Sequence, residues 1–295
     1  MIAARDLFVI GSNIALAVGE LLALQIIRKQ QGRGPNSALT TILAVAASLT
    51  VADLVWEGIE ESAIPLQSLR HSFLWFALVV LLSAEATHRM ARTCWGPAIL
   101  LPVAFAVQTV ALFFPEWFAS REALGALGNT LSALHVGMFL VAYAALLVSA
   151  GCSLVFLIVD RRLKATGKLV AVRGATGLAR LDEMATRAAG IGALILMLSI
   201  ALSLVLLLLL APVRGWAALA VFATDFTIWS SFLIWLYFVA YLVLRSRLGW
   251  VGRRGSLAIV IGAVMMVAFY FGGKLLPRGA LHGYAAQHSV EKEPR

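Results

Sequence analysis

Two histidines in the second half of the chain are the residues whose type and placement could do chemistry. His135 stands at the start of the fifth of eight long apolar stretches, and His282 follows the eighth. Neutral imidazole binds iron well, so two imidazoles at one membrane surface could supply both axial ligands of a six-coordinate haem iron. The simpler alternative is a solvated role at the membrane interface, where the ends of a helix accommodate polar side chains easily.

Composition places these histidines in an integral membrane protein. Of 295 residues, 61% are apolar and only 13% are charged, which is about half the charged fraction of a soluble domain. The apolar stretches are long enough to cross ~30 Å of hydrocarbon as helices, which satisfy their own backbone hydrogen bonds. We therefore expect an all-α polytopic protein with eight transmembrane helices, at about 8–28, 36–56, 72–91, 96–115, 131–159, 186–211, 217–244 and 256–275.

The distribution of basic residues predicts how these helices are oriented. Sixteen Lys and Arg residues flank one set of helix ends and eight flank the other. The positive-inside rule then puts both termini, with His135 and His282, on the outer, periplasmic side of a bacterial inner (cytoplasmic) membrane. The net charge of +9 is mostly a topology signal. Membrane lipid is therefore a predicted partner, and nucleic acid is not.

Acidic residues within or near the spans suggest a second kind of site. Glu20 and Glu85 lie inside predicted helices, where an ionisable group is a functional hypothesis by default. Arg89 follows Glu85 at i+4, so a structural ion pair is favoured over a proton path, which stays open as an alternative. Asp53 and Glu57 are also four residues apart, near the outer end of the second span, and are interpreted as an interfacial acidic patch.

The chain divides near residue 125. We expect an N-terminal four-helix membrane half at 1–125, a second membrane domain at 126–285 and a polar tail at 286–295. A basic inner segment at 160–187 is expected to be partly helical, with LARLDEMATR leading into the sixth span. The two cysteines form no CxxC or CxxCH motif, so a disulfide framework, a cysteine-ligated zinc site and covalent c-type haem attachment are not expected.

Four stretches of the second half carry a recognisable pattern in order. The first two are LHVGMFLVAYAALLVSAGCSLVFLIVDRRLK, which contains His135 and Tyr143, and LDEMATRAAGIGALILMLSIAL. The third is TDFTIWSSFLIWLYFVAYLVLRSRLGWVGRRGS, which contains Asp225 and Trp235, and the fourth is ALHGY, which contains His282. Together they resemble the cytochrome c assembly family of haem-handling membrane proteins, which includes the CcsA, ResC, CcmC and HemX types, and the plan is most similar to HemX.

The resemblance implies a bound haem b with His135 and His282 as its metal ligands. The tryptophan-rich outer loop of synthase-type members is missing, and Val243 replaces a histidine of the seventh helix. One outer haem site is therefore expected rather than a complete cytochrome c synthase. The cofactor-binding residues that the resemblance implies are His135, Tyr143, Asp225, Trp235, Arg278 and His282.

We predict a protein that holds or relays haem at the outer membrane face for cytochrome c biogenesis. Other cytochrome c assembly proteins or a haem-synthesis enzyme would be its partners. No catalytic residue is predicted, and the chain is not expected to be an enzyme by itself. Two alternatives stay open: a non-catalytic regulator or scaffold subunit that uses the basic inner segment, and a proton-coupled small-molecule transporter that uses Glu20 and Glu85.

Overall fold

The computed structural model describes residues 6–29, 36–61, 69–113, 125–166, 177–214 and 226–275. Within them lie eight helices that are long and apolar enough to cross a membrane, so the predicted all-α polytopic fold is confirmed. In chain order the helices are α1 (Asp6–Arg28), α2 (Ser37–Glu61), α3 (Leu69–Ala91), α4 (Trp95–Phe113), α5 (Gly125–Thr166), α6 (Leu178–Arg214), α8 (Phe226–Leu248) and α9 (Arg253–Leu275).

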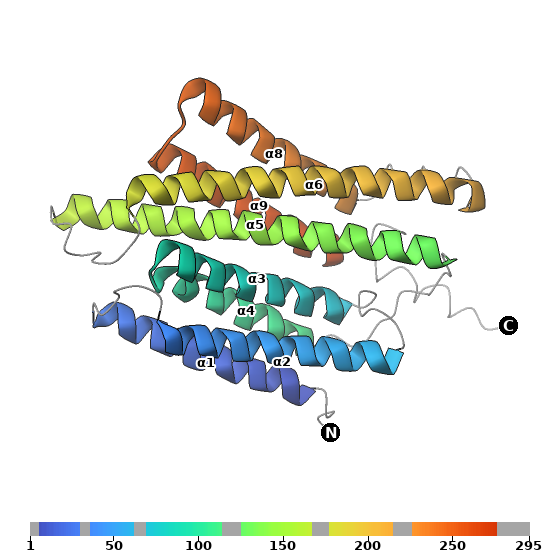
Figure 1. Ribbon diagram of the computed structural model, residues 1–295, viewed down its shortest axis with the longest axis horizontal. Coiled ribbons are helices and arrows are strands. Elements are labelled where there is room, and N and C mark those ends of the chain that lie inside the picture. Colours follow the sequence, from blue (N-terminus) through green and yellow to red (C-terminus); the bar gives the residue numbers. More distant parts are fainter. Residues whose placement is uncertain are drawn as a thin grey trace.

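Helices α1 to α6 run in roughly the same direction, and α8 is tilted relative to them (Figure 1). Among them α5 is central, because it packs against α6, α3 and α9. On one side of it, α3 packs on α4, and α1 packs on both α2 and α4. On the other side, α8 packs against α6 and α9. The predicted boundary near residue 125 stays a prediction, since residues 114–124 are outside the described part of the chain.

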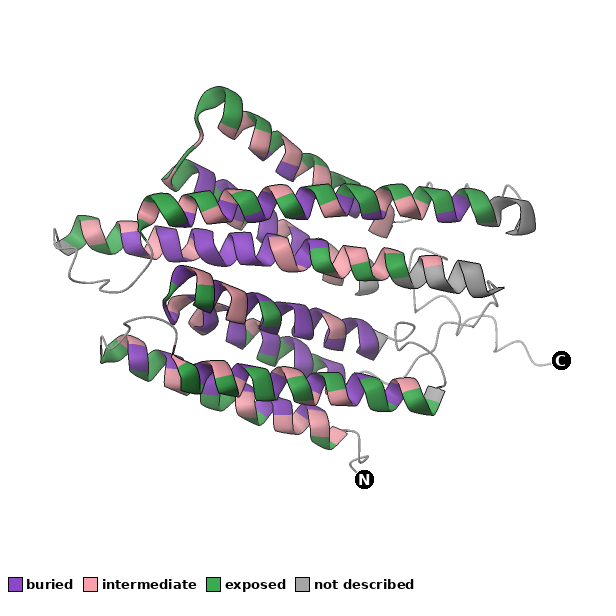
Figure 2. Cartoon of the chain, in the orientation of Figure 1, coloured by how far each residue is buried: buried purple, intermediate pink, exposed green. Residues whose placement is uncertain are grey.

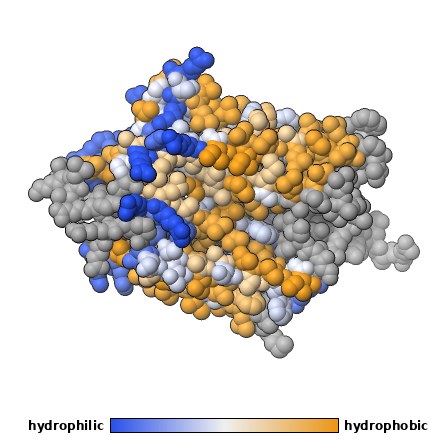
Figure 3. Space-filling view, in the orientation of Figure 1, coloured by the Kyte–Doolittle hydropathy of each residue, from blue (hydrophilic) through white to orange (hydrophobic). Residues whose placement is uncertain are grey.

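The surface of the bundle suits a bilayer. Exposed residues cover the outward sides of α1, α2 and α6, whereas the middle of α5 is largely buried (Figure 2). Figure 3 shows an apolar band across the visible face, with hydrophilic residues gathered at the end where α1 and α5 finish and α6 begins. An exposed apolar band of this kind is what lipid chains cover. That the opposite, less basic end of the bundle faces the periplasm stays a prediction from the charge distribution.

The two helices that flank the basic inner segment extend beyond their predicted spans. α5 continues to Thr166, and α6 already begins at Leu178, so LARLDEMATR is helical as expected. The basic inner segment is therefore helical on both sides of residues 167–176, which are outside the described chain. The seventh span is described from Phe226, whereas its predicted start at 217 falls among residues that the structure does not describe.

Thr87 of α3 fills a junction of three helices. A Cβ atom added to Gly151 of α5 would lie 2.6 Å from Thr87 Oγ1, and one added to Gly96 of α4 would come closer still to the same side chain. Both glycines are therefore required by close helix contact, because small residues let membrane helices approach each other. The junction joins α3 and α4 to the central helix.

Candidate functional site

His135 is held by the neighbouring helix. Its Nδ1 atom lies 2.9 Å from the carbonyl oxygen of Ser199 on α6 and 3.1 Å from the Ser199 hydroxyl oxygen. The single hydroxyl hydrogen of Ser199 is donated to the carbonyl oxygen of His135, at 3.1 Å. Because a carbonyl only accepts, Nδ1 is the nitrogen that carries the proton in the neutral ring. The acceptor lone pair is then on Nε2, the nitrogen that could bind a metal.

Tyr143 lies two turns further along α5, inside an aromatic cluster. It is 1% exposed, and its ring centroid is 4.2 Å from Phe139 and 5.9 Å from Tyr270 of α9. The Tyr270 ring stacks on Phe76 of α3 at 4.6 Å, and its hydroxyl donates to the carbonyl oxygen of Ser72, at 2.8 Å. The cluster therefore joins α3, α5 and α9. A contact between Tyr143 and a cofactor stays a prediction.

The other predicted site residues lie on α8 or outside the described chain. Trp235 of α8 is partly buried and packs against Phe232, one turn earlier on the same helix, with ring centroids 5.5 Å apart. Asp225, Arg278 and His282 fall among residues that the structure does not describe. Their roles at the site therefore stay predictions.

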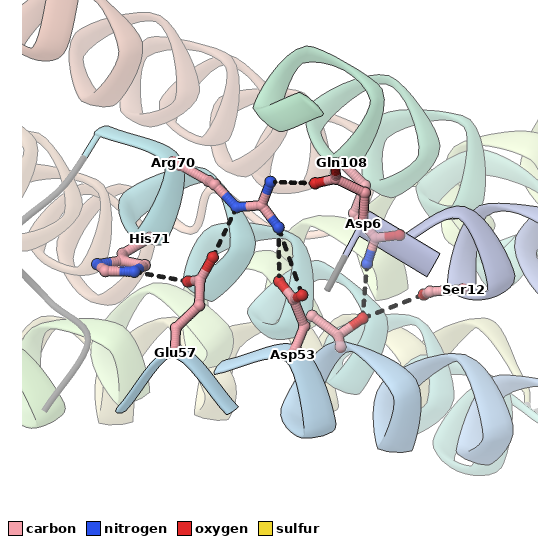
Figure 4. Close-up of polar contacts among 8 residues, drawn as sticks. Asp6, Ser12, Asp53, Glu57, Arg70, His71 and Gln108 are labelled. Atoms are coloured by element: carbon pink, nitrogen blue, oxygen red, sulfur yellow. Dashed lines mark hydrogen bonds and ion pairs between the residues drawn. The ribbon is translucent and has the colours of Figure 1, made fainter. Parts of the chain in front are cut away.

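A buried ionic network lies at the predicted outer ends of α1, α2 and α3 (Figure 4), and it was not predicted from the sequence. Arg70, at the start of α3, places Nη1 2.9 Å from Asp6 of α1, Nη2 3.1 Å from Asp53 and Nε 2.8 Å from Glu57. His71 Nε2 lies 2.6 Å from the second oxygen of Glu57. The side chains of Arg70, His71, Asp53 and Glu57 are at most 4% exposed.

The expectation of an interfacial acidic patch was therefore wrong. Asp53 and Glu57 are buried because the guanidinium of Arg70 pairs with both of them. The polar contacts continue one turn deeper, where the Gln108 amide donates to the Thr50 hydroxyl at 2.7 Å and Ser12 lies 3.1 Å from the same oxygen. The available signal was the short connection between α2 and α3, which brings acids at i and i+4 beside the first turn of the next helix.

A second ion pair joins α6, α8 and the turn before α9 at the basic end of the bundle. Arg245 of α8 donates from Nη1 and Nη2 to the two oxygens of Asp182 on α6, at 3.1 and 2.5 Å. The backbone N–H of Gly252 also donates to Asp182, at 3.1 Å. Gly249 and Gly252 have φ values of 63° and 64°, a conformation that glycine adopts without strain. Asp182 thus fixes the turn that leads from α8 into α9.

Glu85 and His88 have separate partners. Glu85 pairs with Arg89 one turn later, so the predicted ion pair is confirmed. His88 is fully buried, with Nδ1 2.9 Å from the carbonyl oxygen of Thr93 and Nε2 accepting the backbone N–H of Asn36 at 3.0 Å. Both ring nitrogens of His88 bind backbone groups, which indicates a structural role between α2 and α3.

Comparison with known proteins identifies the family. The family model described as cytochrome C assembly protein matches residues 9–281. The chain belongs to this family. The match confirms the resemblance of the second half and extends it through α1–α4. The likeness to the HemX type in particular stays a prediction.

Relatives named cytochrome c biogenesis protein CcsA match nearly the whole chain. Those of Prochlorococcus marinus strains MIT 9303 and MIT 9313 are each 30% identical, over 90% of this chain and 89% of their own length. The CcsA of Parasynechococcus marenigrum (strain WH8102) is 27% identical over 93% of this chain and 94% of its own length. The resemblance therefore includes the N-terminal helices that hold the ionic network.

In this cytochrome c assembly protein, three of the four recognised stretches interlock. The second stretch, on α6, holds the first through Ser199 and His135. It also holds the third through Asp182 and Arg245. No role was predicted for Ser199, Asp182 or Arg245, although all three lie in the stretches that carry the resemblance.

Proposed function

We propose that this cytochrome c assembly protein binds haem b at the predicted outer end of its bundle and holds or relays it for cytochrome c biogenesis. The observation that carries the proposal is the contact between His135 Nδ1 and the carbonyl oxygen of Ser199, at 2.9 Å. Histidines that ligate metals generally donate their other ring N–H to a carbonyl or carboxylate, which fixes the tautomer and raises the basicity of the ligating nitrogen. His135 has this arrangement, and His282 is the proposed opposite ligand.

The donor set around His135 suits haem, which is the cargo in this proposal and offers two axial positions on its iron. Phe139 follows His135 by one turn on α5 and presents an aromatic ring, the kind of surface on which a flat macrocycle packs. Trp235 and Tyr143 are proposed as further packing groups. Arg278 is proposed to pair with a propionate, since guanidinium groups bind carboxylates in a bidentate manner. Asp225 keeps the family's spacing to Trp235 and is proposed as part of the same site.

The proposal also includes the membrane, the orientation and the partners of the protein. We place the protein in a bacterial inner membrane, with the His135 end on the periplasmic side. This placement is supported by the excess of basic residues at the opposite helix ends. Other cytochrome c assembly proteins are the proposed partners, because the relatives are named for cytochrome c biogenesis.

Absorption spectroscopy of the purified full-length protein, supplied with haemin, tests the proposal. We expect a low-spin spectrum of a bis-histidine b-type haem, which His135→Ala and His282→Ala should each abolish. His288→Ala is the matched control, because it removes a histidine only six positions later in the sequence and should leave the spectrum unchanged. Wild-type protein that is purified without haem and takes up no added haemin would refute the proposed function.

A further inference from the structure

A line of polar side chains follows one face of α1. Asp6, Asn13 and Glu20 are spaced seven residues apart, which is close to two helical turns, so they lie above one another on the helix. Asn13 is 8% exposed, and the Oε2 atom of Glu20 is buried. The buried face of α1 meets two helices, because a Cβ added to Gly19 would contact side chains of both α2 and α4. The polar line therefore borders the interior of the N-terminal helices.

The line begins at the buried ionic network. Asp6 pairs with Arg70, which also pairs with Asp53 and Glu57 (Figure 4). Glu57 is also bound by His71. Three carboxylates thus face one guanidinium and one imidazole, so these five side chains carry a net negative charge when all three acids are ionised. A negatively charged group of side chains at the end of a bundle attracts protons from the adjacent water.

The polar contacts continue one turn deeper into the bundle. The hydroxyl of Thr50 lies 3.1 Å from that of Ser12 and accepts the amide N–H of Gln108 at 2.7 Å. The Oε1 atom of Gln108 and the Oδ1 atom of Asn13 are buried, and neither has a hydrogen-bond partner among the described residues. The two side chains are 0% and 8% exposed. An unpaired acceptor inside a membrane protein is costly, and buried water is the usual partner of such a group.

Glu20 is the next polar group on this face of α1, about 10 Å further along the helix axis than Asn13. Its buried Oε2 atom has no hydrogen-bond partner in the described part of the chain. The helices packed on α1 offer no ion pair at this depth, because α4 and residues 37–52 of α2 contain no charged residue. Long side chains on a helix lean towards its start, so the carboxyl group of Glu20 points back towards Asn13.

We propose that Asn13 and Gln108 bind internal water, and that this water connects Glu20 with the aqueous phase at the start of α1. Glu20 takes up a proton from that phase and returns it to the same side, so the exchange is balanced without a redox partner. The water site lies among α1, α2 and α4, whereas His135 lies between α5 and α6. The inference therefore stands apart from haem binding.

Water access is tested with single cysteines in the full-length protein after Cys94 and Cys152 are replaced. Silver ion is small enough to follow a narrow water path and blocks thiols that reach water. Maleimide labelling after unfolding then measures the thiols that remain. The ion is added to spheroplasts or to inverted membrane vesicles, which expose opposite membrane sides. Leu7→Cys, at the exposed start of α1, shows which side this end of the bundle faces.

We expect Glu20→Cys to be blocked from the Leu7 side about tenfold faster than Leu21→Cys, because thiols react as thiolates, which need water. Leu21 is the matched position, since it is the next residue on α1 and is 62% exposed on the outside of the bundle. Equal rates for Glu20→Cys and Leu21→Cys would overturn the inference. Blocking of Glu20→Cys only from the side opposite to Leu7 would also overturn it.

Two further substitutions test the water site itself. Asn13→Leu and Gln108→Leu remove the unpaired oxygens, and each should slow the blocking of Glu20→Cys. Ser149→Ala is the control, because it removes a buried hydroxyl that already donates directly to the carbonyl oxygen of Ala185, at 2.6 Å. Rates in both leucine variants equal to that of Ser149→Ala would contradict the assignment of Asn13 and Gln108.

Proton exchange is tested on the native carboxyl group. Dicyclohexylcarbodiimide modifies protonated carboxyl groups within membranes, and mass spectrometry of the peptide that contains Glu20 measures the extent, with Glu20→Gln as background. We expect modification to respond to the external pH only in the preparation that exposes the Leu7 side. A response only in the opposite preparation, or in neither, would refute the proton exchange.

Discussion

The pair between Asp182 and Arg245 offers a direct test of how the second half of the bundle is held together. Its side chains are only 14% and 17% exposed, and the carboxylate accepts two guanidinium N–H groups and the backbone N–H of Gly252. Hydrogen bonds to charged groups contribute about 1.5–3 kcal/mol each, and removing one partner of a buried pair costs about 3–5 kcal/mol. Because this pair is partly solvated, we expect Asp182→Ala to lower the free energy of unfolding by about 3 kcal/mol.

A double-mutant cycle isolates the pair. We expect the coupling energy between Asp182→Ala and Arg245→Ala to be about 2 kcal/mol, within the range of about 0.5–3 kcal/mol for contacting residues. Reversible unfolding in mixed detergent and dodecyl sulfate micelles, followed by tryptophan fluorescence, measures it.

The matched control is the neighbouring i,i+4 pair of Glu183 and Arg187, whose side chains are 54% and 76% exposed. Exposed helical pairs of this kind couple by about 0.3–0.5 kcal/mol. A coupling energy for Asp182 and Arg245 no larger than that of the control would refute the proposed joint between α6, α8 and the turn into α9.

Three further predictions use the same unfolding assay or simple labelling. Gly151→Ala should lower stability because its Cβ would lie 2.6 Å from Thr87, whereas Gly137→Ala on the same helix should not, and equal stabilities would contradict the close contact. Arg70→Met removes the cation that pairs with the buried Asp53 and leaves Glu57 with His71 alone, so it should destabilise by about 3–5 kcal/mol, with partial recovery in Arg70→Lys. A stable Arg70→Met protein would argue against the network. Burial raises the pKa of the Cys94 thiol from 9.0 to about 11, so a maleimide at neutral pH should label it only after unfolding. The free energy of unfolding should also fall from about pH 9 to pH 11, because the unfolded thiol ionises in this range and the folded one does not. Labelling of the folded protein at the rate of a free thiol would contradict the burial of Cys94.

The helices were largely predictable from the sequence because a bilayer imposes a length and an apolar composition on each of them. The residues at which the helices begin and end were less predictable. α5 continues to Thr166 and α6 starts at Leu178, since hydropathy detects where a helix leaves the hydrocarbon and not where it ends. Helical structure in the basic segment could be expected only from a local pattern such as LARLDEMATR.

The contacts of the site could not be predicted in the same way. His135 was identified by its type and place, but its partner Ser199 depends on how α5 and α6 are rotated about their axes. Arg70 was counted as one basic residue of an outer loop, although it joins α1, α2 and α3. Sequence spacing shows pairs on one helix, such as Glu85 and Arg89, and does not show pairs between helices.

The junction at Thr87 has a consequence for how this chain can vary. One side chain fits against a glycine of α4 and a glycine of α5 at the same time, so neither helix can accommodate a larger residue alone. A bulkier residue at position 87 would meet both glycines, and a side chain at either glycine would meet Thr87. Positions 87, 96 and 151 should therefore covary as a triplet among relatives, with total side-chain volume at the junction kept constant.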